Sequence, residues 1–261
     1  QQPKLLCLMY TMSSAHSNRI RAIRETWAPL CDGFLAFSTQ SDPRLPAISI
    51  PHDGPESYDN MWQKVRSIWK FVGKHYMEQF DYFFLGGDDL FVIPQNLKHY
   101  LATLGQGDPE ETHFVGRRFK AGWGGPDNYF NSGGAGYTLS RGTLRKLYTE
   151  GLDHKECHPT KQTSMEDVQI AECLRKRFGI GLTDTRDDQQ RERFHPFSPG
   201  THMDWQHPQP GKRDWYEDYN TEWGLKLGKD CCAPDSVSFH YIKKSSMVRH
   251  IHALLTTCQQ D

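Results

Sequence analysis

Apolar and polar positions follow two different periods in the first half of the chain. Three short apolar runs have the length of buried strands, at residues 5–10, 34–37 and 82–85. Between the second and third runs, apolar residues recur at helical spacing from Met61 to Tyr76, which predicts a long amphipathic helix. A shorter helix is predicted from Ile20 to Trp27, and the proline-rich segment 43–55 is predicted to be a loop.

The second half of the chain is less regular. It contains a glycine-rich segment at 116–136, a predicted helix at 166–178, a polar stretch at 184–218 and an alternating, strand-like run at 237–241. Neither an internal repeat nor a long linker divides the sequence, so we predict one domain over residues 1–261. Because strands alternate with helices, the expected fold class is α/β with a parallel sheet, and such sheets bind ligands at the carboxyl ends of their strands.

The composition narrows the class of function. The chain has 31 Lys and Arg residues against 32 Asp and Glu residues, and this near-neutral balance argues against a dedicated nucleic-acid binder. No apolar stretch approaches the roughly 18 to 20 residues of a membrane span, although an anchor or signal could precede Gln1. The seven cysteines favour disulfides and an oxidising compartment, with buried thiols as the alternative.

Two adjacent acids, Asp88 and Asp89, follow the third apolar run. Adjacent carboxylates repel each other, so a cation or backbone donors must offset the cost. The glycine loops GxGxxG and GxxxxGKS are absent, so a diphosphate bound here would be neutralised by Mn2+ or Mg2+ held on carboxylates. The alternative is that the two acids only cap a predicted helix from Pro94 to Leu104.

A second acidic pair, Glu166 and Asp167, begins the predicted helix at 166–178. The helix dipole favours acids in a first turn, and a carboxylate in a cleft can also act as a general base on a substrate hydroxyl. The glycines from Gly133 to Gly136 either form a plain turn or let a ligand approach the backbone closely. His240 either makes ordinary hydrogen bonds or binds a metal.

Several further segments occur in an order that is typical of one family. The first set is Arg21–Trp27, Gly87–Asp89, Gly133–Tyr137 and Glu166–Val168. The second set is Ser132–Ser140, Arg193–Phe197, Trp215–Asn220, Cys231-Cys232 and Val237–Tyr241. The first set resembles the inverting β1,3-glycosyltransferases that include Fringe and the β1,3-galactosyltransferases. The second set resembles most closely the core 1 β1,3-galactosyltransferase branch of that family. The resemblance extends over nearly the whole chain.

The resemblance implies a GT-A fold with a mostly parallel central sheet, a UDP-galactose donor, and Mn2+ or Mg2+ as cofactor. It implies inverting transfer of galactose to the 3-hydroxyl of a glycopeptide or glycan acceptor, namely N-acetylgalactosamine on Ser or Thr in core 1 O-glycan synthesis. A donor-binding half at about 1–110 would precede an acceptor-binding half at about 111–261. It also implies residence in the Golgi lumen of the secretory pathway, with a type II membrane anchor upstream of Gln1, and it allows a homodimer.

The resemblance also implies roles for single residues. Asp167 matches the catalytic base, and Asp89 and His240 match the metal ligands. Residues on the nucleotide-sugar side are Arg24, Lys64, Asp88, Gly134 and Glu166, and those near the acceptor sugar are Trp215 and Tyr216. Cys7 with Cys31, and Cys157 with Cys173, resemble family disulfides, whereas the partners among Cys231, Cys232 and Cys258 stay open.

One position departs from the family pattern. Members of the family usually carry three acids where this chain has Gly87, Asp88 and Asp89, so the first acid is missing. Mn2+ could still bind through Asp89, His240, the diphosphate and water, because octahedral coordination accepts several non-protein ligands. Two alternatives therefore stand beside the leading hypothesis: a non-catalytic, chaperone-like homologue, and an enzyme of the same fold that uses another UDP-sugar or acceptor.

Overall fold

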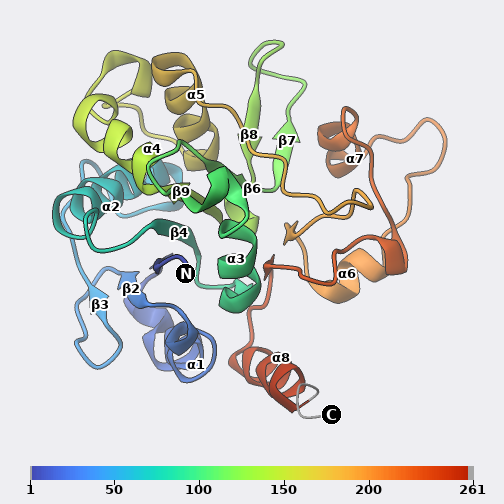
Figure 1. Cartoon of the computed structure of the whole chain (residues 1–261), viewed down its shortest axis with the longest axis horizontal. Helices are drawn as coiled ribbons and strands as arrows, with labels where there is room; N and C mark the ends of the chain where they lie inside the picture. The colour runs from blue at the N-terminus through green and yellow to red at the C-terminus, as the bar shows by residue number, and fades with distance from the viewer. Residues whose placement is uncertain (1, 258–261) are drawn as a thin grey trace.

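A central sheet of six strands organises the computed structural model, which describes residues 2–257 (Figure 1). The strand order is β3 (Ala47–Ile48), β2 (Gly33–Phe37), β1 (Leu5–Tyr10), β4 (Tyr82–Gly87), β9 (Tyr137–Ser140) and β6 (Phe114–Gly116). The first four of these strands run parallel, and β9 runs antiparallel to both of its neighbours. The predicted α/β class with a mostly parallel central sheet is confirmed.

Alternating residues of the central strands face two separate apolar cores. In β1, Leu6 and Leu8 belong to one core, and Leu5, Cys7 and Met9 belong to the other. A strand that is covered on both faces reads in the sequence as a continuous apolar run rather than an alternating one. The short apolar runs of the sequence therefore become the innermost strands of the sheet.

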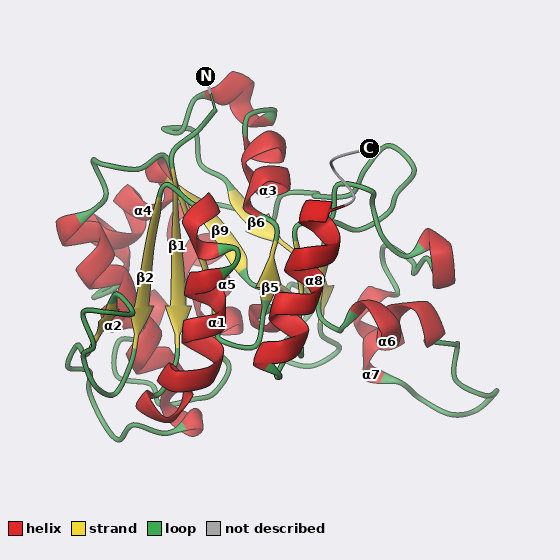
Figure 2. Cartoon of the chain, turned by 90° about the horizontal axis from the view of Figure 1, so that it is seen from below, coloured by secondary structure: helices red, strands yellow, loops and turns green. Residues whose placement is uncertain are grey.

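Helices cover both faces of the sheet (Figure 2). The first core contains residues of α2 (Met61–His75), α4 (Arg141–Lys146) and α5 (Glu166–Phe178), and the second contains residues of α1 (Arg21–Glu25), α3 (Pro94–Leu101) and α8 (Ser245–Thr257). Of the apolar positions that predicted α2, Val65, Ile68, Trp69 and Val72 are buried, and Trp62 joins them on the buried face. Between residues 2 and 257, none of the helices combines the length and apolar character that a membrane crossing needs.

Two small sheets and two short helices complete the regular structure that frames the site. β7 (Arg118–Lys120) pairs with β8 (Tyr129–Asn131), and β11 (Ser238–Phe239) pairs with β10 (Phe194–His195) and β5 (Phe91–Val92). α6 (Pro199–Asp204) lies within the polar stretch 184–218, and α7 (Trp215–Asn220) begins in it and ends two residues beyond it. The pairing of β11 with β5 matters most, because it brings the segment after β11 beside the turn after β4.

The structure corrects three local predictions. Segment 43–55, predicted to be a loop, contains β3, which forms because Ala36 and Ser38 donate backbone hydrogen bonds to Pro46 and Ile48. α1 spans five residues only, and α3 ends at Leu101. These differences arise from backbone hydrogen bonds and local turns, which leave no periodic pattern in the side chains.

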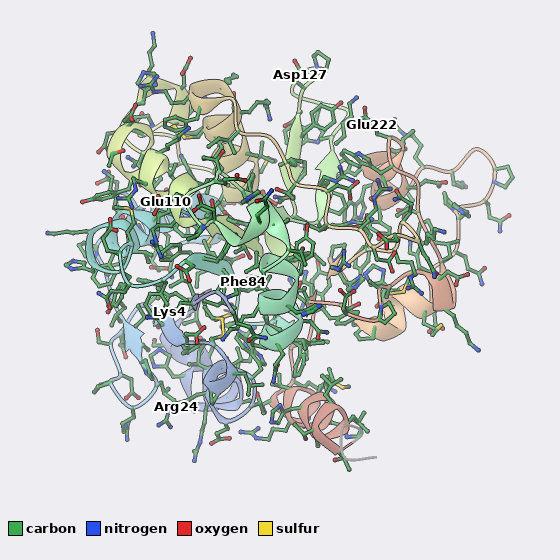
Figure 3. The ribbon with its side chains drawn as sticks, in the orientation of Figure 1. Lys4, Arg24, Phe84, Glu110, Asp127 and Glu222 are labelled. Atoms are coloured by element: carbon green, nitrogen blue, oxygen red, sulfur yellow. A yellow bond between two sulfur atoms is a disulfide. The ribbon has the colours of Figure 1, made fainter. Side chains whose placement is uncertain are left out.

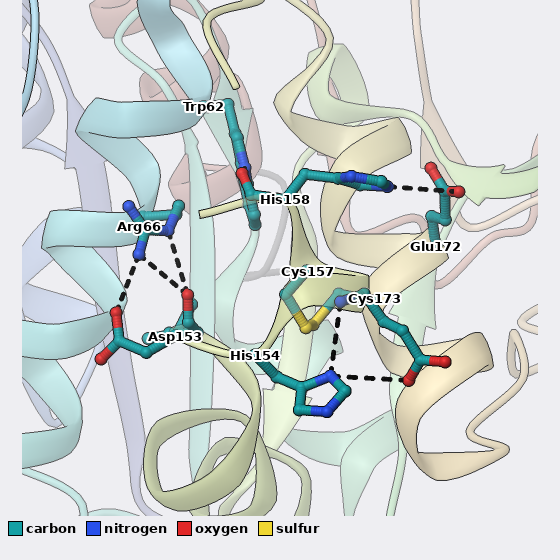
Figure 4. Close-up of a disulfide and its surroundings, with 10 residues drawn as sticks. Trp62, Arg66, Asp153, His154, Cys157, His158, Glu172 and Cys173 are labelled. Carbon is teal, nitrogen blue, oxygen red and sulfur yellow. Dashed lines mark hydrogen bonds and ion pairs between the residues drawn. A yellow bond between two sulfur atoms is a disulfide. The ribbon is translucent and has the colours of Figure 1, made fainter. Parts of the chain in front are cut away.

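Three disulfides occur in the described part of the chain. Cys7 pairs with Cys31 and Cys157 pairs with Cys173, as the resemblance implied, and Cys231 pairs with its neighbour Cys232. Cys258 lies outside the described residues. The second of these bonds joins the segment before α5 to α5 itself (Figure 4). It therefore ties down the helix that begins with Glu166 and Asp167.

Candidate active site

A cavity of about 660 Å³ lies where β1 and β4 end and α5 begins. The predicted site residues that line it are Lys64, Asp88, Asp89, Gly134, Glu166 and Asp167. They come from segments far apart in the sequence, and the parallel sheet brings them to one edge. This is the edge at which open α/β sheets bind ligands.

The turn after β4 carries Asp89, and its side chain meets His240 from the segment after β11. His240 Nε2 lies 3.2 Å from Asp89 Oδ1. Burial raises the pKa of Asp89, but His240 offsets this effect through its hydrogen bond and charge, so that the net pKa lies below the usual value. The structure thus brings the two predicted metal ligands together, although their role as ligands stays a prediction.

The imidazole of His240 is oriented by its second nitrogen. Nδ1 lies 3.2 Å from the carbonyl oxygen of Pro196, directly after β10. The backbone of Ile242 also donates a hydrogen bond to the carbonyl of Asp89 at 2.8 Å, which ties the two segments together. A hydrogen bond at one ring nitrogen fixes the tautomer that leaves the other available as a metal ligand.

Asp88 points to a different set of partners. Thr11 Oγ1 donates to Asp88 Oδ2 at 2.5 Å, and Arg19 Nη1 lies 2.9 Å from Asp88 Oδ1. Burial raises the pKa of Asp88, and Thr11 and Arg19 oppose this rise without cancelling it. Asp88 is therefore held at the wall of the cavity, away from the pair formed by Asp89 and His240.

The acids at the start of α5 contact neutral donors instead of cations. Gly133 donates its backbone N–H to Asp167 Oδ2 at 2.8 Å, and Tyr137 donates its hydroxyl to Glu166 Oε2 at 2.9 Å. Burial raises the pKa of Asp167 despite its backbone hydrogen bonds. Burial, together with the charge of Asp167, raises the pKa of Glu166 well above its usual range. A carboxylate with a raised pKa is a better proton acceptor near neutral pH.

At Gly133 and Gly134, neighbouring side chains pack directly against the backbone. A Cβ atom at Gly134 would lie 2.7 Å from His240 Nδ1, and one at Gly133 would lie 2.5 Å from Glu166 Oε1. Both distances are shorter than real side chains permit, and Gly133 must also present its N–H to Asp167. The sequence could suggest only a turn or a close approach here; the structure shows a close approach of protein side chains.

Lys64 is buried on α2 and faces the cavity. Its Nζ donates to the carbonyl of Thr11 at 2.9 Å and to Glu56 Oε1 at 2.6 Å. Sequence reasoning missed Glu56, and it also missed Tyr10, Thr11 and Arg19, which line the same cavity. Tyr10 and Thr11 could have been found, because they stand at the carboxyl end of the first strand.

The structure places Arg24 apart from the other predicted residues of the nucleotide-sugar side. The apolar residues Ile20, Ile23 and Trp27 point into the core, so helical geometry places Arg24 on the exposed face of α1 (Figure 3). There it lines a separate surface pocket with Arg21 and Arg44, and not the cavity that holds Asp89. The basic residue of the cavity wall in this region is Arg19.

The predicted acceptor residues divide into an exposed and a buried side chain. Trp215 is 48% exposed, whereas Tyr216 is 4% exposed and accepts a hydrogen bond from Arg117 Nη2 at 3.2 Å. Tyr216 is thus buried against Trp215, with ring centroids 5.8 Å apart, and its own role near the acceptor stays a prediction. Neither residue lines the cavity of Asp167, and a role of Trp215 in acceptor binding stays a prediction.

The fit of a divalent cation can be judged from the donor set. Among residues 2–257 there is no group of three or more His, Cys, Asp or Glu side chains that could hold a metal ion. Asp89 and His240 offer one carboxylate and one imidazole within 3.2 Å of each other, and Gly87 adds no side chain. This pair fits a cation such as Mn2+ that takes its remaining ligands from substrate and water.

Comparison with known proteins assigns this geometry to a family. The family model described as Fringe-like matches residues 4–197, which is most of the chain. The chain belongs to the Fringe-like family. The matched region contains the cavity residues from Tyr10 to Asp167, and it ends before His240.

Individual relatives of this Fringe-like chain carry out related chemistry, according to their names. The Xenopus laevis glycoprotein-N-acetylgalactosamine 3-beta-galactosyltransferase 1 is 31% identical over 94% of this chain and 64% of its own length. The human chondroitin sulfate synthase 3 is 28% identical over 62% of this chain and 19% of its own length. The chain thus spans less than two thirds of the length of either relative. Among solved structures, the galactosyltransferase LgtC with donor and acceptor sugar analogs aligns over 95% of both chains, with 11% identity and a TM-score of 0.49.

Proposed function

We propose that this chain is an inverting, metal-dependent β1,3-galactosyltransferase that uses UDP-galactose as donor. The proposed acceptor is N-acetylgalactosamine on Ser or Thr; the name of the relative with 31% identity gives glycoprotein N-acetylgalactosamine as its acceptor. The single observation that carries the proposal is the cavity in which Asp167 and Asp89 share one space. One acid contacts only neutral donors, and the other meets a histidine.

In this proposal Asp167 is the general base. Its carboxylate accepts the proton of the acceptor 3-hydroxyl while that oxygen attacks the anomeric carbon of the donor sugar from the face opposite UDP. The bond from the anomeric carbon to the diphosphate oxygen breaks, and its electron pair leaves with UDP. A single displacement inverts the anomeric centre, so no protein nucleophile is required. Gly133 orients Asp167 by donating its backbone N–H.

The cavity wall would hold the leaving group. Asp89 and His240 would hold Mn2+ or Mg2+, which stabilises negative charge on a diphosphate. Lys64 would add a positive charge on the nucleotide side, and Asp88 would add a hydrogen-bond acceptor there. Gly134 has no side chain, which lets the imidazole of His240 lie close to the backbone. Glu166, next to Asp167, would face the donor sugar.

The cellular setting is also part of the proposal. Three disulfides in the described residues agree with an oxidising compartment. We place the protein in the secretory pathway, in the Golgi lumen, with a type II anchor upstream of Gln1. The division into a donor-binding half and an acceptor-binding half, and a homodimer, remain predictions.

A transfer assay tests the proposal. The protein is incubated with UDP-galactose, UDP-glucose or UDP-N-acetylglucosamine and a peptide that carries N-acetylgalactosamine, with and without Mn2+. We expect a new β1,3-linked galactose only with UDP-galactose and Mn2+. Transfer of a different sugar would contradict the donor assignment and leave the mechanism intact.

The second candidate function, a non-catalytic homologue, rests on Gly87. This residue leaves the site one carboxylate short of the family pattern, and a Cβ atom here would lie 3.2 Å from Asp89 Oδ1. The two candidates differ in one measurement. UDP binding without transfer or hydrolysis of any tested donor would favour the non-catalytic protein and reject the enzyme.

A further inference from the structure

A second pocket lies at the far end of α5 from Asp167. We call it the Arg175 pocket; it has a volume of about 200 Å³, and its lining includes Arg118, Tyr129, Ala171, Arg175, Ile180 and Trp223. It shares no lining residue with the cavity of Asp167. Arg175 lies eight positions after Asp167 on α5, which corresponds to about 12 Å along the helix axis. The two hollows are therefore separate sites.

The charged side chains that line the Arg175 pocket are both arginines. Arg175 donates one hydrogen bond, from Nη1 to the carbonyl of Tyr129 at 3.0 Å, and has no carboxylate partner among the described residues. Arg118 lies 2.7 Å from Asp184, but Asp184 is shared with Arg186 at 2.8 Å. No acidic side chain lines the pocket in the described structure. Two arginines therefore line a pocket whose described lining carries no negative charge, and Arg118 shares its carboxylate partner with Arg186.

The remaining walls of the Arg175 pocket are apolar or aromatic. Ala171 and Ile180 are 2% and 6% exposed. Tyr129 and Trp223 pack edge to face at 5.9 Å, and the Arg118 guanidinium lies 4.9 Å from the centre of the Trp223 ring. Planar guanidinium groups recognise carboxylates through paired hydrogen bonds. A compact ligand with an apolar ring face and one carboxylate matches both features.

The volume of the Arg175 pocket limits the size of the ligand that it can hold. Pockets for drug-sized ligands have volumes of roughly 300 to 1,000 Å³, so the 200 Å³ here suits a single ring. We propose that the Arg175 pocket binds one acidic monosaccharide unit, a uronate. Its carboxylate would bind Arg175 and Arg118, and its ring would pack against Trp223, Ala171 and Ile180. This site goes beyond the proposed transferase reaction and does not require it.

Ligand-observed NMR on the whole protein tests the proposal, with glucuronate as the probe and glucose as its neutral counterpart. UDP and diamagnetic Mg2+ are kept in excess so that binding in the cavity of Asp167 is suppressed. We expect glucuronate to bind at least about tenfold more tightly than glucose. Arg175→Gln should weaken glucuronate at least about fivefold, and Arg175→Lys should weaken it less.

A second variant tests the pocket without changing its charge. A side chain at Gly181, on the rim, would meet nothing within 4 Å, so Gly181→Phe should fold and cover the entrance. Gly200→Phe, on α6 and equally open, is the matched control. Arg177→Gln removes one charge from the same helix outside the pocket lining. Both controls should bind glucuronate like the unmodified protein.

Three outcomes would overturn the proposal. They are equal binding of glucose and glucuronate, glucuronate binding that survives both Arg175→Gln and Gly181→Phe, and absence of glucuronate binding to the unmodified protein. A blocked acidic dipeptide serves as competitor; if it binds through Arg175 while glucuronate does not, the ligand is a peptide carboxylate and the proposal is wrong. Because no step measures sugar transfer, the result is independent of the proposed transferase activity.

Discussion

The cavity contains two pairs of adjacent acids, and their surroundings are opposite. Asp88 and Asp89 face cationic or basic groups, Arg19 at 2.9 Å and His240 at 3.2 Å. Within the described residues, Glu166 and Asp167 accept hydrogen bonds only from neutral donors, the hydroxyl of Tyr137 and backbone N–H groups. The same sequence motif, two neighbouring acids, thus occurs in two different electrostatic environments.

The difference is clearest between Asp89 in the first pair and Asp167 in the second, and it shows what these two acids can do. A carboxylate whose pKa is lowered by a basic neighbour, as in Asp89, stays ionised and suits a cation. A carboxylate whose pKa is raised by burial, as in Asp167, takes up a proton more readily and suits a general base. Pairs of titratable groups with pKa values pushed apart are a mark of acid and base roles in one site.

Asp167→Asn should give the largest effect. The amide keeps the shape and can still accept from Gly133, but it cannot take a proton, so turnover should fall at least about a hundredfold. Calorimetry should show UDP and Mn2+ binding within about twofold of the unmodified protein. Turnover close to the original value would contradict the role of this acid pair.

Removal of the disulfide that holds α5 should have the next largest effect. Cys157 and Cys173 are 16 positions apart, and closing a loop of about 15 residues is worth roughly 3 kcal/mol in the chain-entropy model. Cys157→Ser with Cys173→Ser should lower the free energy of unfolding by about 2 to 3 kcal/mol in urea titrations. Turnover should fall with it, because Asp167 is less well positioned, while Mn2+ affinity is retained. An unchanged free energy of unfolding would show that this disulfide does not stabilise the fold around α5.

His240→Ala tests the other acid pair. Loss of one of two protein ligands should weaken Mn2+ binding in the presence of UDP at least about tenfold, or about 1.4 kcal/mol. Titration calorimetry measures this directly. The Asp167→Asn variant is the matched control, and its Mn2+ affinity should not change. If the two variants lose Mn2+ affinity equally, the pairs do not have separate roles.

Glu166→Gln should give the smallest effect, visible in the pH dependence of stability. Because the folded-state pKa of Glu166 is raised, its contribution is fully present below the unfolded pKa of about 4.3 and declines as pH rises toward the folded pKa. The unmodified protein should therefore lose about 1 kcal/mol more than Glu166→Gln between pH 5 and 7. Urea unfolding at both values measures the difference.

Glu172→Gln is the control on the same helix. Burial raises the pKa of Glu172, but Lys176 and His158 outweigh it, so the net pKa is lowered. The contribution of Glu172 is thus present above pH 4.3 and is lost only as pH falls below it. Its variant should keep the pH 5 to 7 slope of the unmodified protein, and equal slopes in all three proteins would refute the assignment for Glu166.

Much of the fold could be predicted from the sequence alone. The apolar runs gave β1, β2 and β4, and the helical spacing gave α2 and α5 with the correct faces buried. β3 could not be predicted, because it consists of backbone hydrogen bonds at the edge of the sheet. The position of Arg24 outside the cavity could not be predicted either, because a motif match does not tell which face of a short helix points to the cavity.

The sequence by itself determined the strands, the long helices and the positions of the two acid pairs at element ends. These features are local, since burial along one strand or helix fixes the spacing of its apolar residues. Only the tertiary structure decided that His240 meets Asp89, that Arg19 and not Arg24 lines the cavity, and that Tyr216 is buried. Partners, burial and pKa values depend on elements distant in the sequence, and no local pattern records which of them will pack together.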